Sequence, residues 1–507
     1  AVVLDLSKMS GGGLPALQDL AAEIAAVRKA GKRVLAWGEY LDQRQYYLAA
    51  QADEVYIDPF GGVILQGYAY FRTYYKGTLD KLGVKVHVFK VGTHKSAPDT
   101  WIRTNMSPED REEAQGWVGA LWTAYKTDVA TARGIEPDAL QAYADKAGEG
   151  VREFAGDTAQ YAQSRGLVNG LKTREQFEDA VSGLAGMDED EHSYNSVDWR
   201  QYLSVVRSEA ALHKKADRNV AVIVASGEIM DGEQPPGTVG GDTLAALLRD
   251  ARFDDEIKAV VLRIDSPGGS MMASEVVRRE VVALKAVGKP VVASMASVAA
   301  SGGYYIAMDA DRILAAPSTI TGSIGVFAVL PTFEDTLGKV GVTTDGFGTT
   351  KLAGAEHIER GLNPELGSIL QSSVENAYQR FVGAAAKARD RKVEEIDSIA
   401  QGKVWSGKDA KAAGLIDDFA NVDGAFRIAA ELASLGPHHG TRWVEQSSDW
   451  RDALALKMGA TAARFVAWTG FAPLEPPIPG AALLRAEVKP LERMRALQGR
   501  PLYFCGC

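Results

Sequence analysis

Short apolar runs alternate with longer amphipathic stretches along most of the chain. Residues 1–6 (Ala-Val-Val-Leu-Asp-Leu) and 259–264 (Ala-Val-Val-Leu-Arg-Ile) have the composition of buried strands. Segments such as 14–30 and 273–286 have apolar residues at helical spacing. Strands that alternate with helices are typical of βαβ crossovers in a mainly parallel sheet. The pattern therefore predicts the α/β fold class.

This pattern occurs twice. The two strand-like runs match at a shift of about 258 residues, and nearly the same shift relates other segments of the two halves. A shift that stays this constant indicates a duplicated unit, and we predict two tandem copies, residues 1–217 and 218–435. The other matched pairs are 30–35 with 287–292, 46–49 with 304–307, 52–59 with 310–317, and 78–84 with 336–342.

The two copies differ at their ends. The second copy begins near Asn219, about 40 residues before its matched run, whereas nothing precedes Ala1. We therefore expect the natural protein to extend upstream, and a membrane anchor in that part would not be seen in this sequence. Residues 436–507 have no repeat partner and are rich in proline and aromatic residues toward their end. We predict that they form a C-terminal arm for packing or oligomer contact, with membrane-surface contact as the alternative.

A helical layer is expected after the sheet of each copy, because Ser107 and Asn363 each stand before a proline at a first helical position. Two long uncharged stretches, 291–308 and 313–333, contain serine, threonine, glycine or proline. We interpret them as buried strands and turns rather than membrane spans.

Composition excludes several classes of function. The 507 residues are 46% apolar and 24% charged, which is ordinary for a globular protein, and the net charge of −10 gives no support to a nucleic-acid-binding surface. The two cysteines, Cys505 and Cys507, rule out a disulfide framework and a cysteine-rich metal site. We predict neither a metal nor a cofactor.

Two motifs of the second copy suggest acyl transfer, which needs a nucleophile, a base and backbone N–H donors for an oxyanion. Ser301, in Ala-Ala-Ser-Gly-Gly-Tyr, follows a predicted strand among small residues that leave room for a substrate carbonyl. The amide of Gly302 is a candidate oxyanion donor. The turn Ser-Pro-Gly-Gly-Ser at 266–270 exposes further backbone amides. The structural alternatives are an ordinary turn and a packing contact between small residues.

The first copy lacks this nucleophile. Its counterpart of Ser301 is near Gln43, and the two following glycines are replaced by Arg44 and Gln45. We therefore predict a single active serine, in the second copy.

The base is expected to be a lysine, because the first histidine after Ser301 is His357, in a polar stretch. A lysine base must be neutral, so burial has to lower its pKa from about 10.4 toward about 7–8. Ser323, in Thr-Gly-Ser-Ile-Gly, is a candidate hydroxyl to orient the amine. Lys95 and Lys351 lie in corresponding regions of the two copies, so the repeat does not choose between them.

Taken together and in order, these motifs resemble the long, duplicated form of the bacterial signal peptide peptidase A family. The glycine turn and the α/β unit also resemble those of caseinolytic protease subunits and crotonases, which implies a spiral βαβ unit in each copy. The matching motifs are Gly-Thr-His-Lys-Ser-Ala (92–97), Met-Asp-Gly-Glu (230–233), Val-Gly-Gly-Asp (239–242), Ser-Pro-Gly-Gly-Ser (266–270), Ala-Ala-Ser-Gly-Gly-Tyr (299–304) and Thr-Gly-Ser-Ile-Gly (321–325).

The resemblance implies a Ser/Lys dyad divided between the copies, with Ser301 as nucleophile and Lys95 as general base. It implies Gly268 and Gly302 as oxyanion donors, and Ser323 as the residue that positions the amine. Short, unduplicated relatives take both catalytic residues from one copy, so Lys351 stays the alternative base. Each half of the chain alone is expected to be inactive.

The resemblance also implies a homotetrameric bowl that an N-terminal anchor tethers to the inner membrane. Its catalytic part would face the periplasmic or extracytoplasmic side and degrade cleaved signal peptides and other unfolded peptides. Two other functions remain as alternatives. A crotonase-like acyl-CoA enzyme would need a coenzyme A site and usually acidic catalysts, and a peptide-binding scaffold would have no catalysis.

Overall fold

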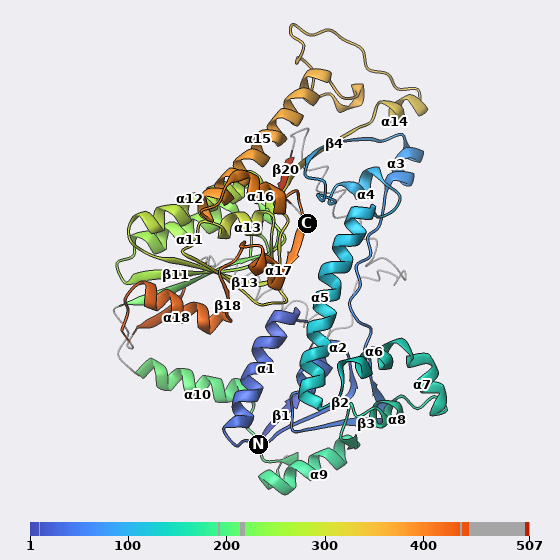
Figure 1. Cartoon of the computed structure of the whole chain (residues 1–507), viewed down its shortest axis with the longest axis vertical. Coiled ribbons are helices and arrows are strands. Elements are labelled where there is room, and N and C mark those ends of the chain that lie inside the picture. Colours follow the sequence, from blue (N-terminus) through green and yellow to red (C-terminus); the bar gives the residue numbers. More distant parts are fainter. Residues whose placement is uncertain (10, 191–192, 213–217, 437–438, 446–501, 506–507) are drawn as a thin grey trace, which may run out of the picture.

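The chain forms two α/β units that lie toward opposite ends of the molecule (Figure 1). The computed structural model describes residues 1–9, 11–190, 193–212, 218–436, 439–445 and 502–505. The prediction of an arm therefore lies largely outside the described residues, as does Cys507.

A parallel sheet forms the first copy, with strands in the spatial order β1 (Val2–Asp5), β2 (Val34–Leu41), β3 (Glu54–Val63) and β5 (Gly170–Leu171). The helix α1 (Leu14–Lys29) connects β1 to β2, as the alternation predicted. Val2 lies opposite Val34 in this parallel pair. Tyr46 and Tyr125 are among the large side chains fully buried in the core beside the sheet.

The second copy repeats this arrangement with more strands. Its eight-stranded sheet has the principal order β17 (Val404–Ser406), β15 (Ile320–Gly322), β13 (Val291–Ala300), β11 (Ile257–Ser266), β8 (Asn219–Ser226) and β19 (Gly440–Trp443). Val260 lies opposite Val291, which is the counterpart of the Val2 and Val34 pair in the first copy. The shared register confirms the predicted tandem α/β units.

Strand β11 shows why the sequences of the central strands are nearly continuous apolar runs. Val260 and Leu262 face a core shared with α11 (Gly241–Phe253) and α12 (Met271–Ala286). Ala259 and Val261, between them in sequence, face a smaller core beneath α18 (Val422–Leu432). Helices cover both faces of this parallel sheet, so the residues on both faces must be apolar. The strand therefore does not alternate between apolar and polar residues.

Two long helices begin as the sequence predicts. The Ser107 hydroxyl accepts a hydrogen bond from the Asp110 N–H at the start of α5 (Pro108–Arg133). Asn363 caps α15 (Pro364–Ala388) in the same way. The uncharged stretches form buried strands and turns, as expected, and none of the helices in the described residues has the length and apolarity to span a bilayer.

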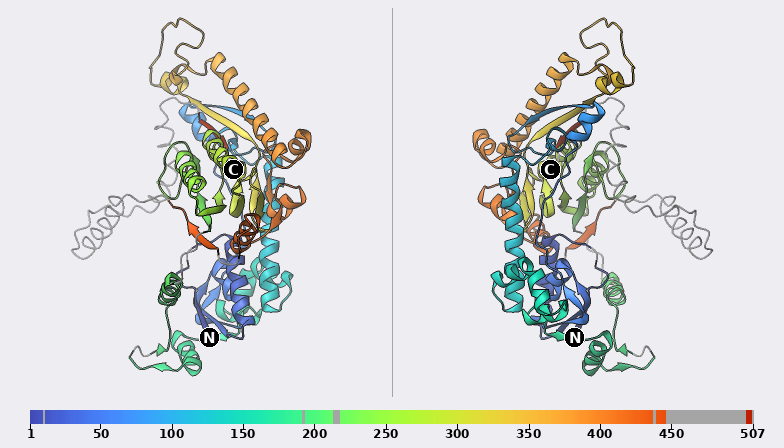
Figure 2. Two further views of the ribbon diagram at one scale, coloured as in Figure 1. Left: turned by 90° about the vertical axis from the view of Figure 1, so that its left-hand side faces the viewer. Right: turned by 90° about the vertical axis from the view of Figure 1, so that its right-hand side faces the viewer.

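One strand of the first copy lies in a sheet of the second. This six-stranded sheet has the order β10 (Val239–Gly240), β9 (Ile229–Met230), β12 (Gly269–Ser270), β20 (Leu502–Cys505), β16 (Val326–Thr332) and β4 (Lys85–Val91). β4 pairs antiparallel with β16, with Val91 opposite Val326. In Figures 1 and 2 the β4 region lies beside α14 and α15 of the second copy, and α5 leads from there back to the first sheet.

Two segments of the predicted arm pair with strands of the second copy. β19 extends the main sheet at its β8 edge, and β20 lies between β12 and β16. The sequence did not predict either strand.

The remaining elements follow in chain order. They are α2 (Gln43–Ala49), α3 (Lys76–Leu82), α4 (Asp99–Ile102), α6 (Pro137–Asp145), α7 (Ala147–Glu153), α8 (Thr158–Ser164), α9 (Arg174–Ala185), β6 (Met187–Asp188), β7 (Ser193–Tyr194), α10 (Trp199–Leu212), α13 (Gly302–Ala307), β14 (Arg312–Ala315), α14 (Glu334–Lys339), η1 (Ile358–Arg360), α16 (Val393–Ile399), α17 (Gly407–Ala412) and β18 (Asp418–Phe419).

Candidate active site

Ser301 lies at a sharp turn between β13 and α13. Its φ of 54° and ψ of −115° are unusual for a residue with a side chain, and such strain is concentrated at functional sites. The turn is held by a hydrogen bond from the Ser301 N–H to the Gly322 carbonyl, 2.8 Å long. A Cβ atom on Gly303 would lie 2.5 Å from the Ser266 carbonyl oxygen, so only glycine fits there. The turn thus presents one hydroxyl at the carboxyl end of the central sheet.

Lys95 reaches this hydroxyl from the other copy. It lies in the loop that follows β4, and its Nζ is 2.9 Å from Ser301 Oγ. The same Nζ donates to Ser323 Oγ at 3.0 Å and to the Ser323 carbonyl at 3.1 Å. Lys95 is 1% exposed, and both serines are equally buried. Burial disfavours a charged amine, which is the condition for a lysine to accept a proton.

Ser323 is fixed by its own backbone. Its φ of 52° is again in the left-handed region, and its N–H donates to the Lys403 carbonyl at 2.7 Å. Both its hydroxyl and its carbonyl thereby face the amine of Lys95. This arrangement allows the residue to orient the amine through two acceptors.

Two glycines that sequence reasoning missed make room for the lysine. A Cβ atom on Gly402, whose φ is +80°, would lie 2.6 Å from the Lys95 backbone nitrogen. A Cβ atom on Gly325 would lie 3.1 Å from Lys95 Cδ. Gly325 was within a motif already noted, but Gly402 lies in a segment that no motif marked. Its contact with Lys95 depends on how the two copies fit together.

Backbone amides converge on the serine. The Gly302 N–H is the first amide of α13 and so has no acceptor within that helix. A Cβ atom on Gly302 would lie 3.2 Å from both Gly268 Cα and the Gly269 nitrogen, so the glycine turn adjoins it. The Gly268 N–H already donates to Ser266 Oγ at 3.2 Å. Gly268 can therefore serve an oxyanion only if that bond opens, and Gly269 offers the neighbouring amide.

The alternative lysine lies elsewhere. The side chain of Lys351 is 85% exposed and pairs with Glu365 at 3.2 Å. The structure brings Lys95, not Lys351, to Ser301.

An extended segment fits beside the glycine turn. β20 pairs antiparallel with β12 on one side, where Cys505 lies opposite Gly269, and with β16 on the other. The space between β12 and β16 thus accepts one extended backbone with hydrogen bonds on both edges.

A pocket of about 670 Å³ opens next to this space. Ser270 of β12 and Tyr305 of the helix after Ser301 are among its lining residues. Burial opposes ionisation of Glu275 in this pocket, but hydrogen bonds from Arg278, Arg279 and Tyr305 outweigh it and lower its pKa to about 2. The pocket therefore combines apolar walls with paired charges.

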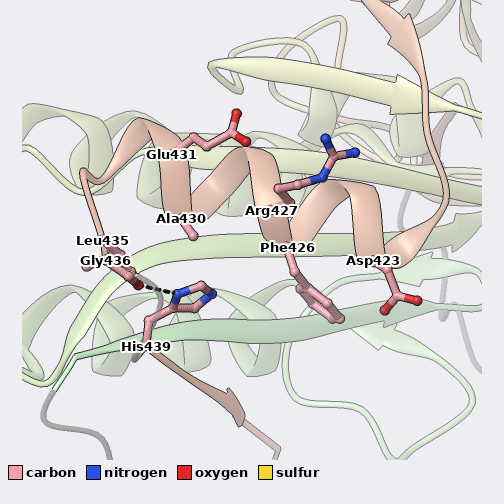
Figure 3. Close-up of a pocket in the computed structure, with 8 residues that line it drawn as sticks. All are labelled: Asp423, Phe426, Arg427, Ala430, Glu431, Leu435, Gly436 and His439. Atoms are coloured by element: carbon pink, nitrogen blue, oxygen red, sulfur yellow. Dashed lines mark hydrogen bonds between the residues drawn. The ribbon is translucent and has the colours of Figure 1, made fainter.

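A second hollow of about 320 Å³ lies along α18 and shares no lining residue with these motifs (Figure 3). Its wall includes Phe426 and His439, and His439 Nδ1 is 2.8 Å from the Gly436 carbonyl oxygen. It does not contribute to the site around Ser301. In the part of the chain that the structure describes, His, Cys, Asp and Glu side chains form no cluster suited to a metal.

Comparisons with known proteins agree with these motifs. The model of peptidase family S49 matches residues 26–188 and 283–436, one segment in each copy. Protease 4 of Salmonella typhi is 45% identical over 86% of this chain and 70% of its own length. Protease 4 of Haemophilus influenzae is 37% identical over 100% of this chain and 82% of its own length. The chloroplastic serine protease SPPA of Arabidopsis thaliana is 31% identical over 85% of this chain and 63% of its own length.

Solved structures match more distantly. ClpP1 from Listeria monocytogenes is 17% identical, with a TM-score of 0.27 over 40% of this chain and 94% of that one. A membrane-bound stomatin-specific protease, 1510-N, is 16% identical, with a TM-score of 0.29 over 46% of this chain and 100% of that one.

Proposed function

We propose that Ser301 is the nucleophile and Lys95 its general base. The chain belongs to peptidase family S49 and is a serine protease. One observation carries the proposal: the 2.9 Å contact between Lys95 Nζ and Ser301 Oγ inside a buried site. The dyad would then be divided between the copies.

The chemistry follows from this contact. A neutral Lys95 amine takes the hydroxyl proton as Ser301 Oγ forms its bond to the scissile carbonyl carbon. The resulting ammonium gives that proton to the departing amine, which leaves an acyl group on Ser301. Water, deprotonated by the same lysine, then hydrolyses the ester. Ser323 keeps the amine directed toward the reacting atoms in both half-reactions, because its hydroxyl and its carbonyl both accept hydrogen bonds from Lys95 Nζ.

Backbone amides stabilise the negative charge of each tetrahedral intermediate. We assign this role to the N–H groups of Gly302 and Gly268, with Gly269 as the donor if the bond between Gly268 and Ser266 persists. Such preorganised donors often contribute about a hundredfold or more to the rate.

The substrates we propose are extended peptides, and in particular cleaved signal peptides. The place of β20 between β12 and β16 supports an extended backbone, and the pocket lined by Tyr305 would take a side chain. We further propose a homotetramer on the extracytoplasmic face of the inner membrane. These assignments rest on the family resemblance.

The proposed function is tested with a fluorophosphonate probe and a signal-peptide substrate in parallel. We expect the probe to label Ser301, as mapped by mass spectrometry, and labelling to abolish peptide cleavage. Labelling of another residue, or hydrolysis of acyl-CoA without cleavage of peptides, would contradict it. Binding of peptides without labelling or cleavage would instead indicate a scaffold.

A further inference from the structure

Glu113 of α5 contacts the lysine loop and the second copy at once. Its side chain is only 6% exposed. Oε1 accepts a hydrogen bond from the Val404 N–H at 2.8 Å, and Oε2 lies 3.2 Å from Nδ1 of His94. His94 directly precedes Lys95, and its backbone N–H donates to the Gln401 carbonyl at 2.9 Å. The carboxyl therefore joins the loop of one copy to β17 of the other.

The β17 segment also positions both serines. Gly322, whose carbonyl accepts the Ser301 N–H, lies opposite Val404 in the pairing of β15 with β17. The Lys403 carbonyl accepts the Ser323 N–H. A group that anchors Val404 thus anchors the backbone behind the nucleophile and behind the residue that orients the amine.

Two buried polar atoms face each other at this junction. Glu113 Oε2 and His94 Nδ1 are 3.2 Å apart but not aligned as ring donor and acceptor, and neither has a hydrogen-bond partner among the described residues. A buried polar atom left unpaired is costly. A proton on Oε2 can be donated to the Nδ1 lone pair once the imidazole ring turns slightly toward it, and the protonated carboxyl then satisfies both atoms.

We propose that Glu113 is a positioning residue whose protonated carboxyl, bonded to His94 and Val404, holds the Lys95 amine in line with Ser301. The proposal rests on the dyad proposed above.

Electrostatics at this junction agrees with the geometry. Burial, helped by the nearby Asp110, raises the pKa of Glu113 to about 8, against the hydrogen bond from Val404 and the attraction of Lys403 and Lys95. The proton therefore stays on the carboxyl at neutral pH and is lost as the pH rises through about 8.

Titratable and charged groups from several elements surround Glu113. Asp110 lies on the same helix and pairs with Arg72 at 3.3 Å, His94 and Lys95 come from the loop after β4, and Lys403 precedes β17. A carboxylate here favours the ammonium form of Lys95, which cannot act as a base. It also loses its donor bond to His94, so both effects lower the rate above pH 8.

The test compares pH profiles of kcat and KM for Glu113→Gln, Glu113→Ala and, as a matched control, the exposed Glu112→Ala on the same helix. The amide of the Gln variant offers one acceptor and one donor without ionising. We expect it to retain kcat at pH 7 within about twofold and to lose the alkaline fall near pH 8. The Ala variant should lose about tenfold in kcat with little change in KM, and the control should match the parent.

An alkaline fall that persists in the Gln variant would overturn the proposal, as would an Ala variant with parental kcat at pH 7. Lys95→Ala, assayed alongside, separates this proposal from the function it rests on. If only the positioning role is wrong, Lys95→Ala is still inactive. If the dyad is wrong, Lys95→Ala retains activity.

Discussion

The same strand-to-helix turn has two different structures in the two copies. In the second copy it holds Ser301 at a positive φ, and Gly303, two residues further on, packs against the Ser266 backbone. In the first copy Asp42 caps α2 with two hydrogen bonds, and Gln43 Oε1 accepts the Gly67 N–H at 2.8 Å. The frame is duplicated, but the first turn is an ordinary capped helix start. The first copy thus keeps the fold without the serine that we propose as the nucleophile.

The loops that carry Lys95 and Lys351 also differ, but here the first copy carries the residue that reaches Ser301. The loop after β4 inserts Lys95 into the second copy, whereas the corresponding loop of that copy leaves Lys351 in solvent. In the proposed site, each copy therefore supplies the part that the other does not. Three predictions test this division.

The largest effect is expected from Ser301→Ala. Peptidase activity should fall to background, about a millionfold, because the corresponding turn of the first copy, at Asp42–Gln45, carries no serine. Adding Gln43→Ser to this variant should restore nothing, since α2 begins there without the strained turn. Turnover of a fluorogenic peptide measures both, and activity in either protein would show that the first copy is competent.

An intermediate effect is expected from Gly402→Ala, which places a methyl group 2.6 Å from the Lys95 nitrogen. Displacement of the loop should lower kcat about a hundredfold. Gly288→Ala is the matched control, because Gly288 has a similar φ of +78° but open space around its Cβ position. Both variants lose about 1–2 kcal/mol of folding stability from the left-handed backbone, and the clash with Lys95 lowers the melting temperature of Gly402→Ala further. Values of kcat are therefore compared well below the melting temperature of either variant. Equal kcat values would contradict the role of Gly402.

A smaller effect is expected from Ser323→Ala. The Lys95 amine would lose one of its two acceptors on this residue, while the Ser323 carbonyl remains. We predict a loss of about tenfold in kcat with KM nearly unchanged. Steady-state kinetics decide the matter, and an unchanged kcat would mean that the hydroxyl does not orient the base.

Much of the fold was predictable because its signals are local. The repeat shift, the alternation of strands and helices, and the caps at Ser107 and Asn363 depend on residues close together in sequence. The strands β19 and β20 were not predictable, because their partners lie far away along the chain. The exact domain boundaries stay a prediction.

The residues of the site also divide into those with a local sequence signal and those without one. Ser301 and the glycine turn were indicated by adjacent residues, and the first copy served as a control. The lysine was chosen by family resemblance, because the repeat made Lys95 and Lys351 equivalent. Gly402 and Glu113 gave no sequence signal, since their roles arise only where the two copies touch.

The central claim is that Lys95 of the first copy activates Ser301 of the second. The rate constant for fluorophosphonate labelling of Ser301 measures that activation without a peptide substrate. We predict at least about a thousandfold slower labelling in Lys95→Ala and a parental rate in Lys351→Ala. A parental rate in Lys95→Ala, or slow labelling confined to Lys351→Ala, would contradict the account.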